Sequence, residues 1–194
     1  MSESHQQILA LDVAPEDAEA VAERLRTWLR DRRFAVPDPD AVDDFPPNSR
    51  RGVLSLPADR LGPGFTVRPT EWDDPRHDPR WSFIYVHVPH DEDHRIWYLG
   101  DSTGPSDCRY CGTPFADEPF WAAFNAWLEG PEPTLTCADC GGTALMGDQD
   151  TSGSIVVSPL GIVTSDDGWD LVPELLGALR ADFGGRWTWV HHHP

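Results

Sequence analysis

Four cysteines occur as two close pairs that share one spacing. The first pair is Cys108 and Cys111, the second is Cys137 and Cys140, and a glycine follows each pair. A turn of this length lets two thiolates reach one ion, and glycine relieves the backbone strain after the second ligand. Two such knuckles supply four sulfur ligands, which complete a tetrahedron and leave no open position. The spacing therefore predicts a structural metal site rather than a catalytic one.

Zinc is the ion that we expect at these cysteines. Iron is the second choice, because four thiolates in paired knuckles also suit a rubredoxin-like site. A redox-active disulfide is the third, since only Arg109 is adjacent to activate a thiol. The first 20 residues contain no apolar signal segment, and no stretch has the roughly 18 apolar residues of a membrane span. We therefore expect a cytoplasmic protein with no membrane partner, whose cysteines are reduced and bind metal.

The two knuckles resemble the zinc-ribbon family, a broad class of four-cysteine modules. The resemblance covers about residues 106–148 and implies an inserted zinc module in an otherwise unrecognised chain. The knuckles are separated by 25 residues, more than the usual spacing of about 15 to 20. An amphipathic helix is predicted within this interval at 117–130, so a treble-clef-like variant is an alternative to a plain ribbon. The apolar stripe of that helix consists of Phe120, Trp121, Phe124, Trp127 and Leu128.

The charge of the chain restricts its partners. It has 15 basic residues, all of them arginine, against 33 acidic ones, for a formal net charge of -18. The absence of lysine, with abundant alanine, glycine, proline, aspartate and arginine, is typical of a high-GC bacterial genome. Many zinc ribbons bind nucleic acid, but a strongly acidic chain repels it, so we expect a protein partner with a basic surface. Residues 101–150 contain one basic residue, Arg109, and nine acidic ones. These acids are Asp101, Asp107, Asp117, Glu118, Glu129, Glu132, Asp139, Asp148 and Asp150.

A second metal site is conceivable at three histidines. His87, His90 and His94 lie at the end of one predicted strand and in the acidic turn that follows it. An open site made by these imidazoles would activate water for a metal-dependent hydrolase. Three nearby residues could join it: His77, Asp91 and Asp93. The simpler interpretation is that these histidines belong to a solvated polar turn. We therefore assign no catalytic residue and no cofactor-binding residue from the sequence.

Periodicity predicts an α+β fold with a mostly antiparallel sheet. Helices are expected at 15–33 and 172–183, packed on that sheet. The expected strands are 5–13, an antiparallel hairpin formed by 81–88 and 95–102, a strand from 155 to 164 broken at 159–161, and a last strand around 187–189. The expected domains are an α+β domain at 1–105 and 149–194, and the inserted four-cysteine module at 106–148.

These features favour a non-enzymatic, acidic protein-binding module, such as an inhibitor, an immunity-like protein or an adaptor, stiffened by structural zinc. The metal-dependent hydrolase is the alternative. Among nine tryptophans, Trp72 and Trp169 lie beside acidic turns, where they would either anchor a partner or complete the core. The acids that we expect to contact a partner first are Asp38, Asp40, Asp43, Asp44, Asp73, Asp74, Asp166 and Asp167.

Overall fold

The computed structural model describes residues 4–38, 59–67, 82–89 and 95–193. These residues form three α-helices, ten strands and short 3-10 turns, which confirms the predicted α+β class. The helices are α1 (Ala18–Asp31), α2 (Asp117–Glu129) and α3 (Val172–Asp182). The strands are β1 (His5–Ala10), β2 (Ala35–Val36), β3 (Asp59–Leu61), β4 (Phe83–His87), β5 (Ile96–Tyr98), β6 (Thr134–Thr136), β7 (Thr143–Leu145), β8 (Ile155–Val157), β9 (Gly161–Ser165) and β10 (Trp187–His192). In this described part of the chain, no helix is both long and apolar enough to cross a bilayer.

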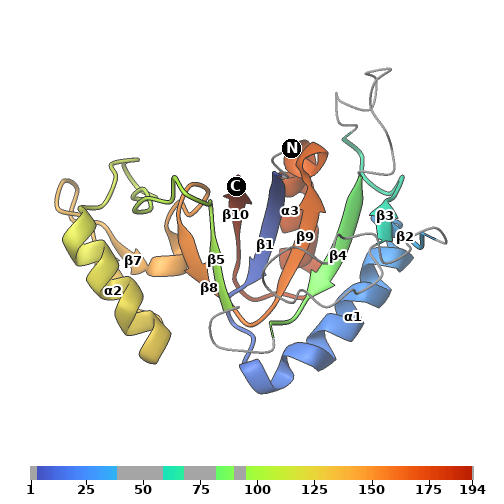
Figure 1. Cartoon of the computed structure of the whole chain (residues 1–194), viewed down its shortest axis with the longest axis horizontal. Coiled ribbons are helices and arrows are strands. Elements are labelled where there is room, and N and C mark those ends of the chain that lie inside the picture. The colour runs from blue at the N-terminus through green and yellow to red at the C-terminus, as the bar shows by residue number, and fades with distance from the viewer. Residues whose placement is uncertain (1–3, 39–58, 68–81, 90–94, 194) are drawn as a thin grey trace.

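The main sheet has six strands in the order β10-β1-β9-β4-β3-β2, and every neighbouring pair is antiparallel. Strand β1 lies between β10 and β9, with Ile8 opposite both Trp189 and Ile162. The two ends of the described chain are therefore neighbours in one sheet (Figure 1). Two small ribbons, β5-β8 and β6-β7, lie outside it.

Helices α1 and α3 cover one face of the main sheet. The apolar residues of α1 recur every three or four positions, so Ala18, Ala22, Leu25 and Leu29 are buried together. Pro15 opens the 3-10 turn that leads into α1, a position where its missing N–H costs nothing. This first hydrophobic cluster also contains residues of β1, β4, β9 and α3.

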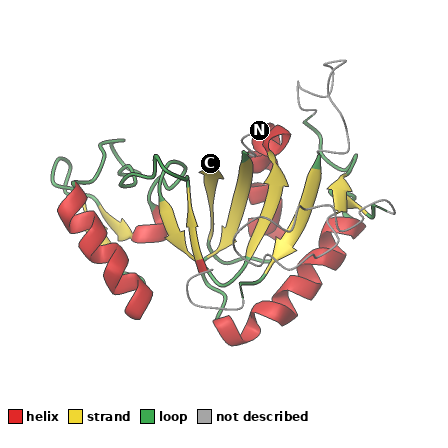
Figure 2. Ribbon diagram, viewed as in Figure 1, coloured by secondary structure: helices red, strands yellow, loops and turns green. Residues whose placement is uncertain are grey.

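The opposite face of the sheet is covered by the segment that carries the cysteines. Side chains alternate along a strand, so Ile8 joins the first cluster and its neighbour Leu9 joins a second one. The second cluster combines Leu9 with Trp97 of β5 and with Phe120 of α2. Figure 2 shows α2 and the small ribbons forming a third layer beside the sheet. Because this cluster includes residues on both sides of the predicted 106–148 boundary, the division into two domains stays a prediction.

The predicted hairpin of strands 81–88 and 95–102 is wrong. Both segments contain strands, but β4 pairs with β3 and β9 in the main sheet while β5 pairs with β8 in a ribbon. The break predicted at 159–161 explains why β4 and β5 do not pair with each other. At this break the chain leaves β8, the partner of β5 in the ribbon, and enters β9, the partner of β4 in the main sheet. Ser158 fixes this break: its Oγ lies 2.8 Å from both the Ala10 and the Leu160 carbonyl oxygens, which share its single hydroxyl proton.

Gly161 of β9 lies where the two layers meet. A Cβ on this residue would approach the Trp97 ring to 2.7 Å and Leu9 Cδ2 to 2.9 Å. The Trp97 indole N–H donates to the Ser158 carbonyl at 2.9 Å, so the ring is held and cannot retreat freely.

We expect Gly161→Ala to lower the free energy of unfolding by about 1–3 kcal/mol, the usual cost of overpacking a core. Urea denaturation followed by far-UV circular dichroism measures this change. The control is Gly153→Ala, since a Cβ at Gly153 has no heavy atom within 4 Å. Equal stability of the two variants would contradict the close approach.

Candidate metal centre

The four cysteine Sγ atoms all lie within 4.8 Å of one another. Cys108 Sγ is 3.7 Å from Cys140 Sγ, and Cys111 Sγ is 3.7 Å from Cys137 Sγ. A regular tetrahedron with metal–sulfur bonds of about 2.3 Å has sulfur–sulfur edges of about 3.8 Å. A disulfide would require about 2.05 Å, and all four cysteines are free. The cluster can therefore hold a metal ion.

Both knuckles are built by the same local hydrogen bond. The Gly112 N–H donates to the Cys108 carbonyl at 2.8 Å, and the Gly141 N–H donates to the Cys137 carbonyl at 2.9 Å. Each of these glycines has a φ of 72°, in the left-handed region that other residues rarely adopt. The sequence C-x-x-C-G thus folds into a turn that points both sulfur atoms of a pair to the same side.

Different elements position the two knuckles. The second one is the turn of the β6-β7 hairpin, whose last pair, Thr136 and Thr143, brings its hydroxyl oxygens within 3.0 Å. The first is closed by a bridge between Asp107 and Pro114 and lies just before α2. The helix predicted at 117–130 is confirmed as α2.

The sulfur atoms differ in their hydrogen bonding. Cys111 Sγ is 3.4 Å from Thr113 Oγ1, and hydrogen bonds with the side chain and backbone of Thr113 lower the pKa of Cys111 to about 6. The Gly142 N–H, 3.4 Å from Cys140 Sγ, also acts to lower the pKa of Cys140. The neighbouring cysteine sulfurs and burial outweigh this bond and raise the pKa of Cys140 to about 12. Four sulfurs this close ionise together only around a cation.

The site is buried on one side and exposed on the other. Cys108 and Cys137 are buried, whereas Cys111 and Cys140 are exposed, so an ion can enter from solution. Tyr110 covers part of the exposed side: a Cβ on Gly142 would overlap its ring, and its hydroxyl donates to the Thr143 carbonyl at 3.3 Å. Sequence analysis missed this bridge between the knuckles, although Tyr110 lies inside the first one.

Arg186, just before β10, joins the cysteine segment to the main sheet. Its guanidinium donates to both carboxylate oxygens of Glu132, at 2.7 and 2.9 Å, and to Asp148 Oδ1 at 2.8 Å. The Gly147 N–H donates to the same Glu132 carboxylate at 2.6 Å. These two acids raise the pKa of Arg186 above its usual value despite partial burial. Sequence analysis also missed this contact, because its partners are far apart in the chain.

The structure does not test the predicted histidine site. His87 lies on β4, with its ring 5.5 Å from that of Trp97 in an edge-to-face arrangement. His90 and His94 lie outside the described residues, as do His77, Asp91 and Asp93. Within the described ranges, the four cysteines are the group of metal-ligating side chains that lie close enough to share an ion.

We expect Cys108→Ser and Cys140→Ser to lose most of the bound metal, because a hydroxyl replaces a thiolate ligand. The cysteine segment should then unfold at a lower temperature. Metal content after gel filtration and a thermal melt measure both effects. Thr134→Val is the control, since Thr134 is exposed on β6 of the same segment and the change keeps all four sulfur atoms. A melting curve unchanged in both serine variants would rule out a structural metal site.

We expect Arg186→Met to cost about 2 kcal/mol of stability, since it leaves two part-buried carboxylates without their cation. Arg26→Met is the matched control. Arg26 pairs with Glu23, whose side chain is 74% exposed, so this surface pair should contribute less than about 1 kcal/mol. Urea unfolding of both variants checks the difference, and equal losses would contradict the role of Arg186.

Comparisons of the chain with protein-family models, with curated proteins and with solved structures find no match. The identification of a metal centre therefore rests on the chain's own geometry. Two sulfur–sulfur distances in the cluster are 3.7 Å, which agrees with the edge of about 3.8 Å in a metal–sulfur tetrahedron.

Proposed function

We propose that this protein is a non-enzymatic, acidic protein-binding module stiffened by a structural zinc ion. The observation that carries the proposal is the distribution of charge. Acidic side chains of the segment that carries the cysteines are exposed, while several arginines are paired with acids of the same chain. A basic protein is the partner that such a surface attracts.

Zinc is the ion that the cysteine cluster suits best. It prefers four tetrahedral sulfur ligands, and in such a site it contributes folding energy rather than chemistry. Iron remains the alternative, because four thiolates also bind it in this geometry. Reduced thiols are typical of the cytoplasm, where we propose that the protein resides.

Most acids of the segment that carries the cysteines face solvent. Of the nine between residues 101 and 150, the exposed ones are Asp101, Asp117, Glu118, Glu129, Asp139 and Asp150. The basic residue among them, Arg109, has its guanidinium 5.7 Å from the centre of the Tyr110 ring. This surface opposes binding of nucleic acid, whose affinity depends on phosphate contacts with lysine or arginine.

Arginines elsewhere are engaged by acids of the same chain. Arg30 pairs with Asp59 at 2.8 Å, and Arg32 pairs with Asp182. Arg60 and Asp38 are 2.7 Å apart. Arg30, Arg32 and Arg60 are therefore paired with acids of the same chain, so the net charge of -18 acts outward mainly through carboxylates.

We expect basic proteins to bind the metal-loaded chain in a salt-dependent way, because screening weakens attraction between exposed charges. The immobilised protein should retain basic proteins from its own lysate at about 0.05 M NaCl and release most of them at about 0.5 M. Mass spectrometry of both fractions measures this. Retention of a neutral or acidic set, or retention insensitive to salt, would overturn the proposal.

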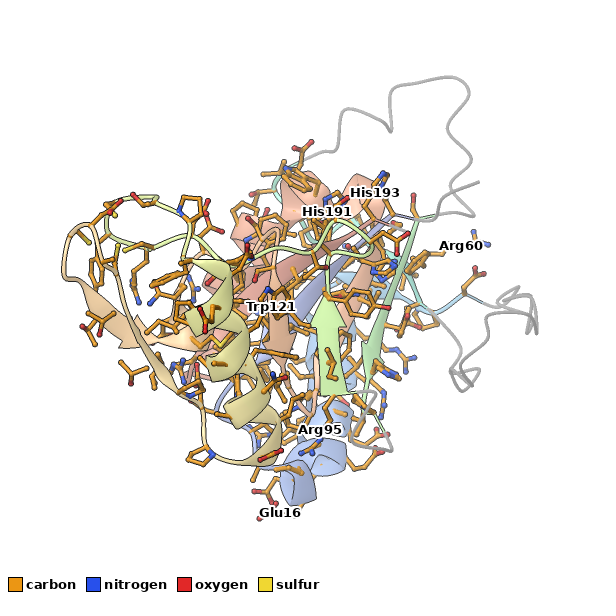
Figure 3. All side chains as sticks on the ribbon, turned by 60° about the vertical axis from the view of Figure 1, so that its left-hand side comes forward. Glu16, Arg60, Arg95, Trp121, His191 and His193 are labelled. Carbon is orange, nitrogen blue, oxygen red and sulfur yellow. The ribbon has the colours of Figure 1, made fainter. Side chains whose placement is uncertain are left out.

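Two triple variants test the location of the attraction. The first variant removes three exposed charges from α2 by combining Asp117→Asn, Glu118→Gln and Glu129→Gln. Glu16→Gln with Asp17→Asn and Glu19→Gln removes the same number near the start of α1, where Figure 3 labels Glu16. The first variant should retain several-fold less partner than the second. Metal analysis of the same protein should give one equivalent per chain, whereas a second, chelator-labile equivalent would favour the hydrolase alternative.

A further inference from the structure

The four cysteines differ in their access to solvent. Cys108 and Cys137 are only 2% and 4% exposed, whereas Cys111 and Cys140 face solvent, so each knuckle has one buried and one exposed member. The thiolate, which is the form that binds metal, is also the form that reacts with peroxides. A small oxidant in solution can therefore reach one sulfur of each knuckle directly.

Each exposed sulfur lies against a buried sulfur of the other knuckle. Cys111 Sγ is 3.7 Å from Cys137 Sγ, and Cys140 Sγ is 3.7 Å from Cys108 Sγ. A disulfide bond is about 2.05 Å long, so each pair must approach by about 1.7 Å. Rotation of a cysteine side chain about its Cα–Cβ bond moves the sulfur by that much. Both exposed sulfurs thus have a partner for a disulfide between the knuckles.

Pairing between the knuckles and pairing within them have different consequences for the fold. A disulfide within a knuckle closes one short turn and leaves the two knuckles unconnected. The pairs between knuckles join residues 26 and 32 positions apart in the chain. A disulfide that closes a longer loop removes more entropy from the unfolded chain, so the pairs between knuckles stabilise the folded segment more.

We propose that the cluster is a thiol oxidation site as well as a metal site: hydrogen peroxide converts it into two disulfides, Cys111–Cys137 and Cys108–Cys140. The exposed thiolate attacks one oxygen of peroxide and breaks the O–O bond, which forms a cysteine sulfenic acid and releases hydroxide. The buried thiolate then attacks that sulfur, and a second hydroxide leaves. Two thiolates are oxidised for each peroxide reduced, and both hydroxides take protons from solvent to become water.

Oxidation removes the ligands of the metal but keeps the segment closed. A sulfur in a disulfide is no longer a thiolate, so the site releases its ion. The Cys111–Cys137 bond closes a loop that contains the whole of α2, the helix that buries Phe120 and Phe124 in the second hydrophobic cluster. This inference rests on the proposed function, in which the thiolates hold structural zinc, and specifies how that site responds to an oxidant.

Disulfide mapping tests the pairing, because proteolysis separates the four cysteines. Cleavage after arginine and before aspartate gives the peptides 107–109, 110–116, 117–138 and 139–147, each with one cysteine. The metal-loaded protein is treated with two equivalents of hydrogen peroxide, remaining thiols are blocked, and the unreduced digest is analysed by mass spectrometry. We expect 110–116 joined to 117–138 and 107–109 joined to 139–147, with one equivalent of zinc released to a chromogenic chelator.

Three results of the same experiment would overturn the proposal. One is a disulfide that joins 107–109 to 110–116, which is the pairing within a knuckle. Another is sulfinic or sulfonic acid at the cysteines without any disulfide. The third is zinc that stays bound while all four thiols remain unmodified.

Serine variants test each pair separately. In Cys111→Ser, we expect Cys140 to bond Cys108, so Cys137 is the thiol that remains free. Pairing within a knuckle would instead leave Cys108 free in this variant and would contradict the proposal. Thr134→Val, exposed on β6, is the control and should form the same two disulfides as the unchanged protein.

A thermal melt of the unchanged chain keeps the test valid if the serine variant fails to fold. The oxidised, metal-free protein should melt at a higher temperature than the reduced protein stripped of metal by a chelator, because the cross-links remain. An equal or lower melting temperature would contradict disulfides between the knuckles.

Failure of this inference and failure of the proposed function give different results. If peroxide forms no disulfide between the knuckles while the reduced protein retains basic lysate proteins, the inference is overturned and the proposed function stands. If both disulfides form with release of zinc but the lysate yields no basic partner, the inference is supported and the proposed protein-binding function fails.

Discussion

The convergence of four thiols within 4.8 Å constrains the rest of this structure. Sulfur atoms so close repel one another when ionised, so four thiolates can occupy these positions together only around a cation. The knuckles lie on either side of α2, and that helix buries Phe120 and Phe124 in the second hydrophobic cluster. A cation bound by the four cysteines would therefore fix both ends of the segment whose middle covers the sheet. It would couple metal binding to closure of one face of the main sheet through this helix.

The coupling extends through a sheet that is buried on both faces. Ile8 faces α1 and α3, whereas Leu9 faces α2 and the ribbons, so β1 contributes to both clusters at consecutive positions. Loss of the outer layer would expose Leu9 and its apolar neighbours to water, at a cost that scales with the exposed area. Arg186 opposes that separation, because its ion pairs with Glu132 and Asp148 cross the same junction.

The sequence alone predicts what is local. Each knuckle depends on a turn closed within five residues, so the spacing of the cysteines and glycines predicts it. Helices α1 and α2 depend on apolar periodicity, so the spacing of their apolar residues predicts them. The strand pairing of β4 and β5 could not be predicted in this way, because two adjacent aromatic strands also form a hairpin. Instead β4 pairs with β3, 23 or more residues away, and with β9, 74 or more residues away, while β5 pairs with β8, 57 or more residues away. Arg186 was missed for the same reason: 54 residues separate it from Glu132.

A chain with a net charge of -18 must also remain folded against its own repulsion. Several arginines lie where segments distant in sequence meet: Arg30 joins α1 to Asp59 of β3, and Arg32 joins α1 to Asp182 of α3. Placed at such junctions, each cation offsets repulsion between neighbouring elements. The stability of the fold and the negative charge of its surface thus follow from one arrangement of charge.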